Sequence, residues 1–259
     1  GRNVACTPGD VVLRNEVLEL IQYKPQTEQV YAIPLLVVPP QINKYYVLDL
    51  SPANSFVNYA VKQGFQVFMV SWRNPGPELA YLSLQHYVEA LEQAHEAVMQ
   101  ITGAKTVNFK GLCAGGITSA IALGRYADQG KLGTVNSLTL NVTLLDIAGM
   151  AQTNMGYFLT ESGLENSLKR SKKEGVLHGH ELSKMFAWLR PNDLVWNYWV
   201  NNYLMGQKPP AFDVLFWNSD STRMPAALHA DFCALLKGNE LGSGEVYAMD
   251  DAQVDLKNV

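Results

Sequence analysis

The sequence has few of the features that mark several common classes of protein. Three cysteines in 259 residues are too few and too scattered for a disulfide framework, which favours a reducing, cytoplasmic environment. Charged residues make up only 17% and the formal net charge is −4, so the concentrated Lys and Arg that nucleic-acid binding requires are missing. No apolar run reaches the roughly 18 residues of a membrane span, and the first residues show no signal-peptide pattern.

The composition that remains is that of a globular protein. Apolar residues make up 47% of the chain, which predicts a packed core. The length fits one large α/β domain or a core with an insertion. The chain starts at Gly1 without an initiator Met, which indicates a segment taken from a longer protein.

Apolar runs of strand length alternate with helical patterns in the first 146 residues. Strands are expected at 11–23 (one strand or a pair), 35–38, 66–71, 106–109 and 135–145. Helices are expected at 55–63, at 83–101, and from a turn at 111–116 to about residue 126. Strands that alternate with helices predict a parallel sheet with helices on both faces.

This alternation stops near residue 147. From there to about residue 240 the chain is rich in Trp and Asn and has helical stretches without a strand rhythm. We interpret 1–146 as the core, 147–240 as an inserted, mainly helical cap over the carboxyl edge of the sheet, and 241–259 as the return to the core.

The turn GLCAGG, at 111–116, carries the strongest chemical signal. It follows an apolar strand and precedes a helix, the context of a nucleophile elbow, here with Cys113 in place of the usual serine. A sharp turn of this kind needs small neighbours, and Gly111 and Gly115 supply them. The N–H of Ala114 is then expected to face a developing oxyanion. The helix N-terminus is expected to lower the pKa of the thiol.

Two other interpretations of the same turn stay open. A free cysteine is often a buried structural residue, and Cys113 would then have no chemical role. A glycine-rich phosphate loop is the other, although neither a Lys-Ser/Thr ending nor a GxGxxG pattern is present.

Longer stretches resemble a known family. They are PLLVVPPQINKYYVLDL (34–50), VSWRNP (70–75), GLCAGG (111–116), LRPNDLVWNYWVNNYL (189–204) and VLFWNSDSTRMP (214–225). Together they span most of the chain and are similar to class I and II polyhydroxyalkanoate synthases. The resemblance implies an α/β-hydrolase fold and the polymerisation of 3-hydroxyacyl-CoA thioesters into polyester with release of CoA.

The resemblance also implies roles for particular residues. Cys113 matches the family's nucleophile, and the loop Pro40–Asn43 lies where such folds supply a second oxyanion donor, for which we take the N–H of Ile42. No cofactor or metal is implied. The implied partners are the acyl-CoA substrate and the polyester granule at whose surface the family works. The resemblance further implies a homodimer formed through the cap and, from a class I-like cap, short acyl chains.

In this family an Asp and a His that complete the catalytic triad follow the cap. The segment AQVDLKNV (252–259) resembles the lead-in to the strand before that Asp, so both partners are expected beyond the end of this sequence. The chain alone is therefore expected to be an inactive fragment. Two other functions stay open: a thioesterase or esterase that shares the elbow, and a non-catalytic granule-associated module.

Other titratable residues have weaker claims to a site. Asp146 ends a strand at an edge where some α/β-hydrolases place their acid, but a loop or helix-cap role is the alternative we favour. His95 is expected to be a packed or partly exposed helix residue, and His229 to lie at the surface. His178 and His180 have no further ligands nearby in sequence, which favours a cap loop over a metal site.

Overall fold

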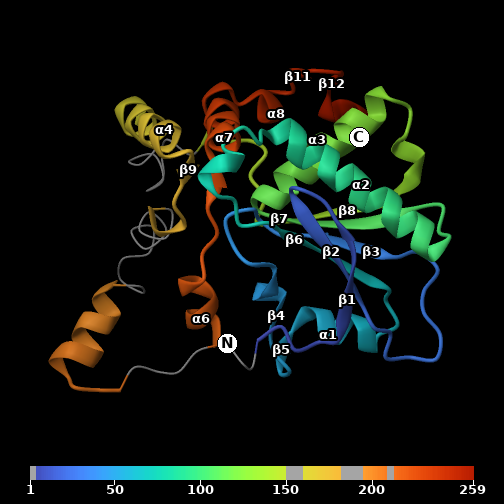
Figure 1. Cartoon of the computed structure of the whole chain (residues 1–259), viewed down its shortest axis with the longest axis horizontal. Helices are drawn as coiled ribbons and strands as arrows, with labels where there is room; N and C mark the ends of the chain where they lie inside the picture. Colours follow the sequence, from blue (N-terminus) through green and yellow to red (C-terminus); the bar gives the residue numbers. More distant parts are fainter. Residues whose placement is uncertain (1–3, 150–159, 182–194, 209–212) are drawn as a thin grey trace.

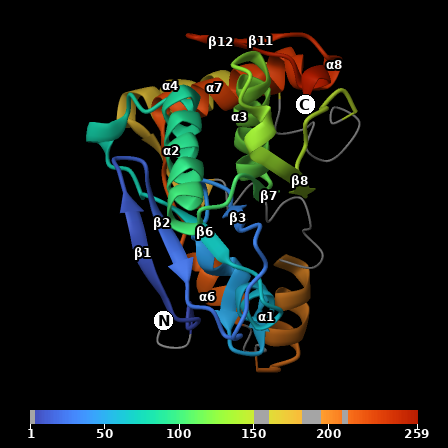
Figure 2. The same cartoon turned by 90° about the vertical axis from the view of Figure 1, so that its right-hand side faces the viewer.

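A six-stranded sheet forms the centre of the computed structural model, which describes residues 4–149, 160–181, 195–208 and 213–259. The strands, which are labelled in Figure 1, lie in the order β1-β2-β6-β3-β7-β8, and this order runs from left to right in Figure 2. Their bounds are β1 (Gly9–Arg14), β2 (Leu18–Tyr23), β6 (Val67–Trp72), β3 (Leu35–Val38), β7 (Val107–Leu112) and β8 (Val135–Asn141).

The parallel sheet predicted from the sequence is confirmed in four of these strands. β3 pairs in parallel with β6 and with β7, and β7 pairs in parallel with β8. The segment expected as one strand or a pair is an antiparallel hairpin of β1 and β2, and β2 adds to β6 in antiparallel orientation. The four parallel strands therefore bring their carboxyl ends to one edge, where the turn after β7 lies.

Three helices cover the two faces of the sheet. They are α1 (Phe56–Lys62), α2 (Leu84–Thr102) and α3 (Ala114–Asp128). Figure 2 shows α1 on one side of the sheet and α2 and α3 on the other. The alternation within β3 explains the two layers, because Val37 packs with α1 residues while Leu36 and Val38 pack with α2 and α3. None of the described helices has the length and apolar composition needed to cross a membrane.

The strand expected at 135–145 is shorter than predicted. β8 ends at Asn141, and Val142 has a positive φ of 47°. A β-branched residue in this conformation breaks the extended backbone that a strand requires. The apolar residues after Val142 therefore belong to a loop, and the prediction of their strand is wrong.

The region predicted as a cap contains helices and one short strand pair among its described residues. Their bounds are α4 (Glu161–Glu174), β9 (Val176–Leu177), η7 (a π-helix, Trp199–Leu204), α6 (Asp213–Ser219), β10 (Met224–Pro225) and α7 (Ala226–Gly238). The parts of the predicted cap at 150–159, 182–194 and 209–212 lie outside the described residues. The cap boundaries therefore stay a prediction.

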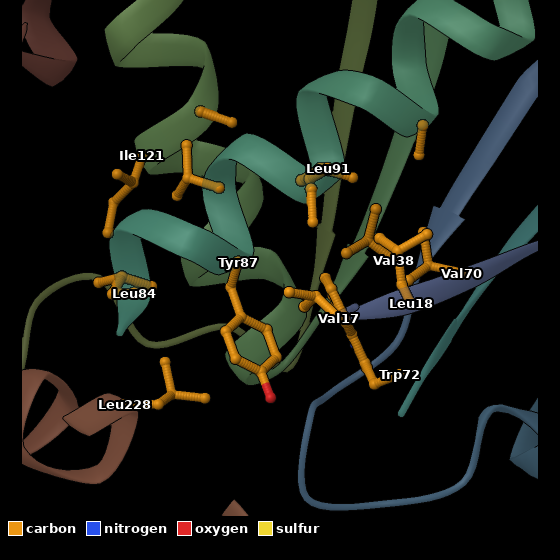
Figure 3. Close-up of a cluster of buried hydrophobic side chains, with 14 of the residues drawn as sticks. Val17, Leu18, Val38, Val70, Trp72, Leu84, Tyr87, Leu91, Ile121 and Leu228 are labelled. Carbon is orange, nitrogen blue, oxygen red and sulfur yellow. The ribbon is translucent and has the colours of Figure 1, made fainter. Parts of the chain in front are cut away.

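One helix of this region belongs to the main hydrophobic core. Leu228 of α7 is fully buried in the same cluster as Leu84 and Tyr87 of α2 (Figure 3). The start of α7 is also held by backbone hydrogen bonds from Ala227 and Leu228 to the loop before α2. Helix α7 is thus fixed to the layer that supports α3.

The two ends of the predicted insertion lie side by side. Asn239 Oδ1 accepts the N–H of Ile147 at 2.8 Å, and Asn239 Nδ2 donates to Asp146 Oδ1 at 3.1 Å. An insertion into a compact core requires such proximity, because the chain has to leave and return at the same place.

Short elements complete the described structure. They are η1 (Tyr45–Leu48), β4 (Asp49–Ser51), β5 (Asn54–Ser55), η2 (Pro77–Leu79), η3 (Leu132–Thr134), α8 (Glu240–Ser243), β11 (Tyr247–Met249), β12 (Ala252–Val254) and η8 (Leu256–Asn258). The hairpin of β11 and β12 packs on α3 and is not part of the six-stranded sheet.

Candidate active site

Cys113 sits between the last residue of β7 and the first residue of α3. Its backbone has φ 51° and ψ −123°, and its N–H donates to Asn141 O of β8 at 3.0 Å. A non-glycine residue in this region of φ/ψ space is strained, and such strain occurs mainly at functional sites. The predicted strand-to-helix elbow with an uncommon backbone conformation is therefore confirmed.

The glycines of the elbow are required by close backbone contacts. A Cβ at Gly111 would lie 2.6 Å from Gly116 Cα, and a Cβ at Gly115 would lie 2.3 Å from Pro39 O. Side chains at these positions would push the first turn of α3 away from the sheet. The prediction that the elbow needs small residues on both sides of Cys113 is therefore confirmed.

The prediction that the helix N-terminus brings the pKa of the Cys113 thiol below its ordinary value is wrong. Burial raises the pKa of Cys113 above its ordinary value, and the hydrogen bond from the Ala114 N–H to the thiol lowers that pKa by a smaller amount. The thiol is thus mostly protonated at neutral pH, and a nucleophilic role requires a base to remove its proton. The Ala114 N–H forms its hydrogen bond with the sulfur of Cys113, and no carbonyl of a described residue accepts it.

The loop that carries Ile42 follows β3 and lies against the elbow. Trp72 is buried at the end of β6, and its Nε1 donates to Pro39 O at 2.7 Å. No hydrogen bond from the Ile42 N–H to any described residue is formed, so this donor is available to a ligand. Whether Ile42 serves as the second oxyanion donor stays a proposal.

Residues 216–223, which lie in the region predicted as a cap, pack against this loop. Thr222 N–H donates to Ile42 O at 3.1 Å, and Asn43 forms an antiparallel bridge with Ser221. Two side chains extend the contact, because Tyr46 Oη donates to Asp220 Oδ2 at 2.8 Å and Trp217 Nε1 donates to Lys44 O at 2.8 Å. The loop is therefore held between the elbow and the segment that precedes α7.

No histidine of the chain contacts Cys113, and all five lie in described residues. Their partners are Ser83 for His86, Tyr126 for His95, Glu174 for His178, the ring of His178 for His180, and Ser171 for His229. His229 is 7% exposed, so the expected surface position is wrong, because α4 packs over that face of α7. His95 is packed in the core, as expected.

The remaining candidates have structural contacts. Asp146 is exposed and accepts hydrogen bonds from Ala148 N–H and from Asn239, which lower its pKa. It therefore serves as a loop residue at the start of the predicted insertion. Within the described residues, no group of three or more His, Cys, Asp or Glu side chains is arranged to hold a metal ion.

The sequence did not reveal two buried polar residues that join the loop to the elbow. Gln41 Nε2 donates to Thr118 Oγ1 at 2.7 Å, across 77 positions of sequence. Neither residue belongs to a recognisable motif. Their one signal is the occurrence of polar residues inside otherwise apolar stretches, beside the loop and within α3.

The fold and the elbow together define the class of protein. Residues 34–232 match the family described as "alpha/beta hydrolase fold", and residues 1–60 match the family described as "Poly-beta-hydroxybutyrate polymerase (PhaC) N-terminus". The chain therefore belongs to the α/β-hydrolase fold family. A putative lipase from Sulfolobus solfataricus has the same fold, with a TM-score of 0.50 and 14% identity over 85% of this chain and 78% of the lipase.

The curated relatives of the chain are polymerases of 3-hydroxyalkanoate. Poly(3-hydroxyalkanoate) polymerase 1 and polymerase 2 of Ectopseudomonas oleovorans are 50% and 51% identical to this chain over its 259 residues. The chain spans 46% of the length of each of them. The polymerase subunit PhaC of Cupriavidus necator is 46% identical over 87% of this chain and 39% of its own length. The resemblance to polyhydroxyalkanoate synthases predicted from the sequence is confirmed.

Proposed function

We propose that this chain is the nucleophile-bearing part of an acyltransferase that polymerises 3-hydroxyacyl-CoA into polyhydroxyalkanoate. The observation that carries the proposal is Cys113, a cysteine held in a strained elbow at the carboxyl edge of a parallel sheet. The names of the relatives, which are polymerases of 3-hydroxyalkanoate, support the substrate class.

The proposed chemistry follows from the thiol. Cys113 Sγ loses its proton to a base and attacks the thioester carbonyl of the substrate. A new acyl–sulfur bond forms on the enzyme, the bond between the acyl group and CoA sulfur breaks, and the CoA thiolate takes up the proton. One thioester replaces another, so the acyl group stays activated on Cys113. The hydroxyl of a second unit then attacks the acyl-enzyme, and an ester bond replaces the thioester.

Two backbone donors are proposed to stabilise the oxyanion of each step. They are the N–H of Ala114, at the first position of α3, and the N–H of Ile42. Both groups lack a carbonyl acceptor among the described residues, and the positive end of α3 adds to the stabilisation. A backbone donor without a carbonyl partner in this position is typical of an oxyanion hole.

Acyl transfer to the chain can be measured directly. The purified chain is mixed with 3-hydroxybutyryl-CoA, and the mass of the intact protein and of its peptides is recorded. We expect one acyl group on Cys113 and none in a Cys113→Ala variant. Cys6→Ser is the matched control, because Cys6 is an exposed free thiol away from the elbow and its loss should change nothing.

The same experiment distinguishes the proposed polymerase from a thioesterase or esterase and from a non-catalytic module. An acyl group that is lost to water faster than it is transferred to a second hydroxyacyl unit would favour a thioesterase or esterase. An unmodified Cys113 after prolonged exposure would favour a non-catalytic granule-associated module.

The cap is proposed to form a homodimer, and the granule surface to be the place of work, both on the resemblance. The described part of the cap supports an interface because η7 exposes large apolar side chains. They are Trp199, Tyr203 and Leu204, of which Tyr203 is 71% exposed. We expect a dimer by sedimentation equilibrium and a shift towards monomer for Tyr203→Lys, whereas a monomeric parent chain would contradict the interface.

A further inference from the structure

Gln41 and Thr118 form a buried polar link between the loop after β3 and helix α3. Gln41 is 1% exposed and Thr118 is fully buried. Gln41 Nε2 lies 2.7 Å from Thr118 Oγ1, and Thr118 Oγ1 lies 3.1 Å from Ala114 O. Two consecutive hydrogen bonds therefore connect the loop to the residue that follows Cys113.

The donors and acceptors of this link are fixed by the chemistry of a hydroxyl. Thr118 has one hydroxyl hydrogen, which it donates to Ala114 O, so it accepts from the amide of Gln41. The carbonyl oxygen of Gln41 then faces the other way, and it is buried without a partner among the described residues. An unpaired buried oxygen is unfavourable, because it has lost its hydrogen bonds to water. An apolar side chain would avoid this cost, so the bond to Thr118 is the contribution that distinguishes glutamine here.

The link ends next to the two peptide groups that carry the proposed oxyanion donors, at the side chain of Gln41 and at the carbonyl of Ala114. The Ile42 N–H belongs to the peptide directly after Gln41, and the next peptide is held by the bond from Thr222 N–H to Ile42 O. On the other side, Ala114 supplies both the carbonyl that accepts from Thr118 and the second donor N–H. Gln41 and Thr118 therefore connect the two backbone segments that carry these N–H groups.

We infer that Gln41 is a positioning residue of the oxyanion hole, which acts through Thr118 to hold the Ile42 N–H in register with the Ala114 N–H. The inference rests on the proposed function, since it assumes that Cys113 is acylated. A displacement of about 1 Å in such a site can cost about 10²-fold in rate. Loss of the link should thus slow acyl transfer more than it slows reactions that need no oxyanion hole.

Two reactions of the same thiol separate these effects. Acylation by p-nitrophenyl butyrate passes through an oxyanion and releases p-nitrophenolate as the acyl–sulfur bond forms. Alkylation by iodoacetamide needs the thiolate but no oxyanion hole. The ratio of the two rates, with a Cys113→Ala blank subtracted, reports on the oxyanion hole and is insensitive to a general change in exposure of the thiol.

The variants form a matched set. Thr118→Val removes the hydroxyl at nearly constant volume, and we expect acylation to fall about 10-fold to 10²-fold with alkylation changed by less than about threefold. Thr118→Ser keeps the hydroxyl and should restore the ratio. Gln41→Met removes the amide that donates to Thr118 and should reproduce the effect of Thr118→Val. Either variant can therefore test the inference if the other fails to fold.

Each other outcome is decisive. Equal losses in acylation and alkylation, or no loss in either, would overturn the positioning role. A parent chain whose Cys113 is alkylated by iodoacetamide but that releases no p-nitrophenolate above the blank would overturn it too, because the thiol would react without an oxyanion hole at work. If the parent chain reacts with p-nitrophenyl butyrate but takes no acyl group from 3-hydroxybutyryl-CoA, the proposed function fails while the role of Gln41 stands.

Discussion

At the scale of single residues, the elbow combines backbone strain with close packing. A non-glycine residue at the φ and ψ of Cys113 costs about 1–3 kcal/mol, which the surrounding contacts have to offset. The elbow is also packed closely against the backbone after β3, since a Cβ at Gly115 would lie 2.4 Å from Val38 O and 2.3 Å from Pro39 O. The same closeness brings the loop of Ile42 to the start of α3.

We therefore expect Gly115→Ala to lower the free energy of unfolding by about 1–3 kcal/mol, because its Cβ would meet backbone atoms that have no rotamer to adopt. Denaturant titration followed by circular dichroism measures the change. Gly133→Ala is the matched control, since no atom lies within 4 Å of a Cβ at Gly133. Equal stability of the two variants would mean that the contact between α3 and the loop is looser than described.

The residues of the site differ in how far sequence reveals them. Cys113 was predictable because its glycine neighbours and its place between a strand and a helix are local signals. The pKa of its thiol was not, because the burial that raises it comes from distant segments and outweighs the helix N-terminus. Gln41 and Thr118 were missed for the same reason, since their contact joins positions 77 residues apart.

At the scale of secondary-structure elements, the layer of α2 and α3 contains a buried histidine that is sensitive to acid. His95 of α2 packs edge-on against Phe109 of β7, and its Nδ1 lies 2.9 Å from Tyr126 Oη of α3. Burial lowers the pKa of His95 to about 4. A protonated His95 would place an uncompensated charge between the two helices and the sheet.

The direction of the pH effect follows from this pKa. An unfolded histidine has a pKa of about 6.5, so His95 contributes stability that is present above pH 6.5 and lost as the pH falls through about 4. We expect the difference in unfolding free energy between the parent chain and His95→Gln to shrink by up to about 3 kcal/mol from pH 7 to pH 4. Urea titrations across this range measure it, and a pH-independent difference would contradict the assignment.

The junction of the predicted insertion offers a second test at this scale. Asn239→Asp should destabilise the junction, because a second carboxylate would face Asp146 where an amide now donates. The loss should be larger at low than at high salt, since exposed charges are screened. Adding Asp146→Asn exchanges donor and acceptor and should recover much of the stability. Failure of the double variant to recover would mean that the pair does not fasten the junction.

The element boundaries show what local signals determine. The buried strand at 35–38 was predicted to the residue, because Pro39 and Pro40 stop an apolar run. The end of β8 was missed, since the positive φ of Val142 has no local sequence signal. The burial of His229 was also missed, because it depends on the packing of α4 against α7.

At the scale of the whole molecule, the described residues include the proposed nucleophile and the two proposed backbone donors, but no histidine lies beside the thiol. All five histidines have other partners, and burial raises the pKa of Cys113. The chain spans 46% of the length of its Ectopseudomonas relatives. A histidine contributed by another part of a longer protein would supply the missing proton transfer, and the resemblance places that residue after the cap.

We therefore expect the chain alone not to polymerise 3-hydroxybutyryl-CoA, because loss of a general base costs about 10²–10⁴-fold and loss of a triad histidine can cost more. The comparison is a hybrid in which residues 1–259 replace the matching segment of poly(3-hydroxyalkanoate) polymerase 1 of Ectopseudomonas oleovorans, to which they are 50% identical. CoA release, followed by chromatography, should be sustained in the hybrid and abolished by Cys113→Ala within it. Circular dichroism of the chain alone checks that it is folded. Turnover by the chain at a rate comparable to the hybrid would mean that a base lies within it, and substitutions of His229 and His95 would then locate that base.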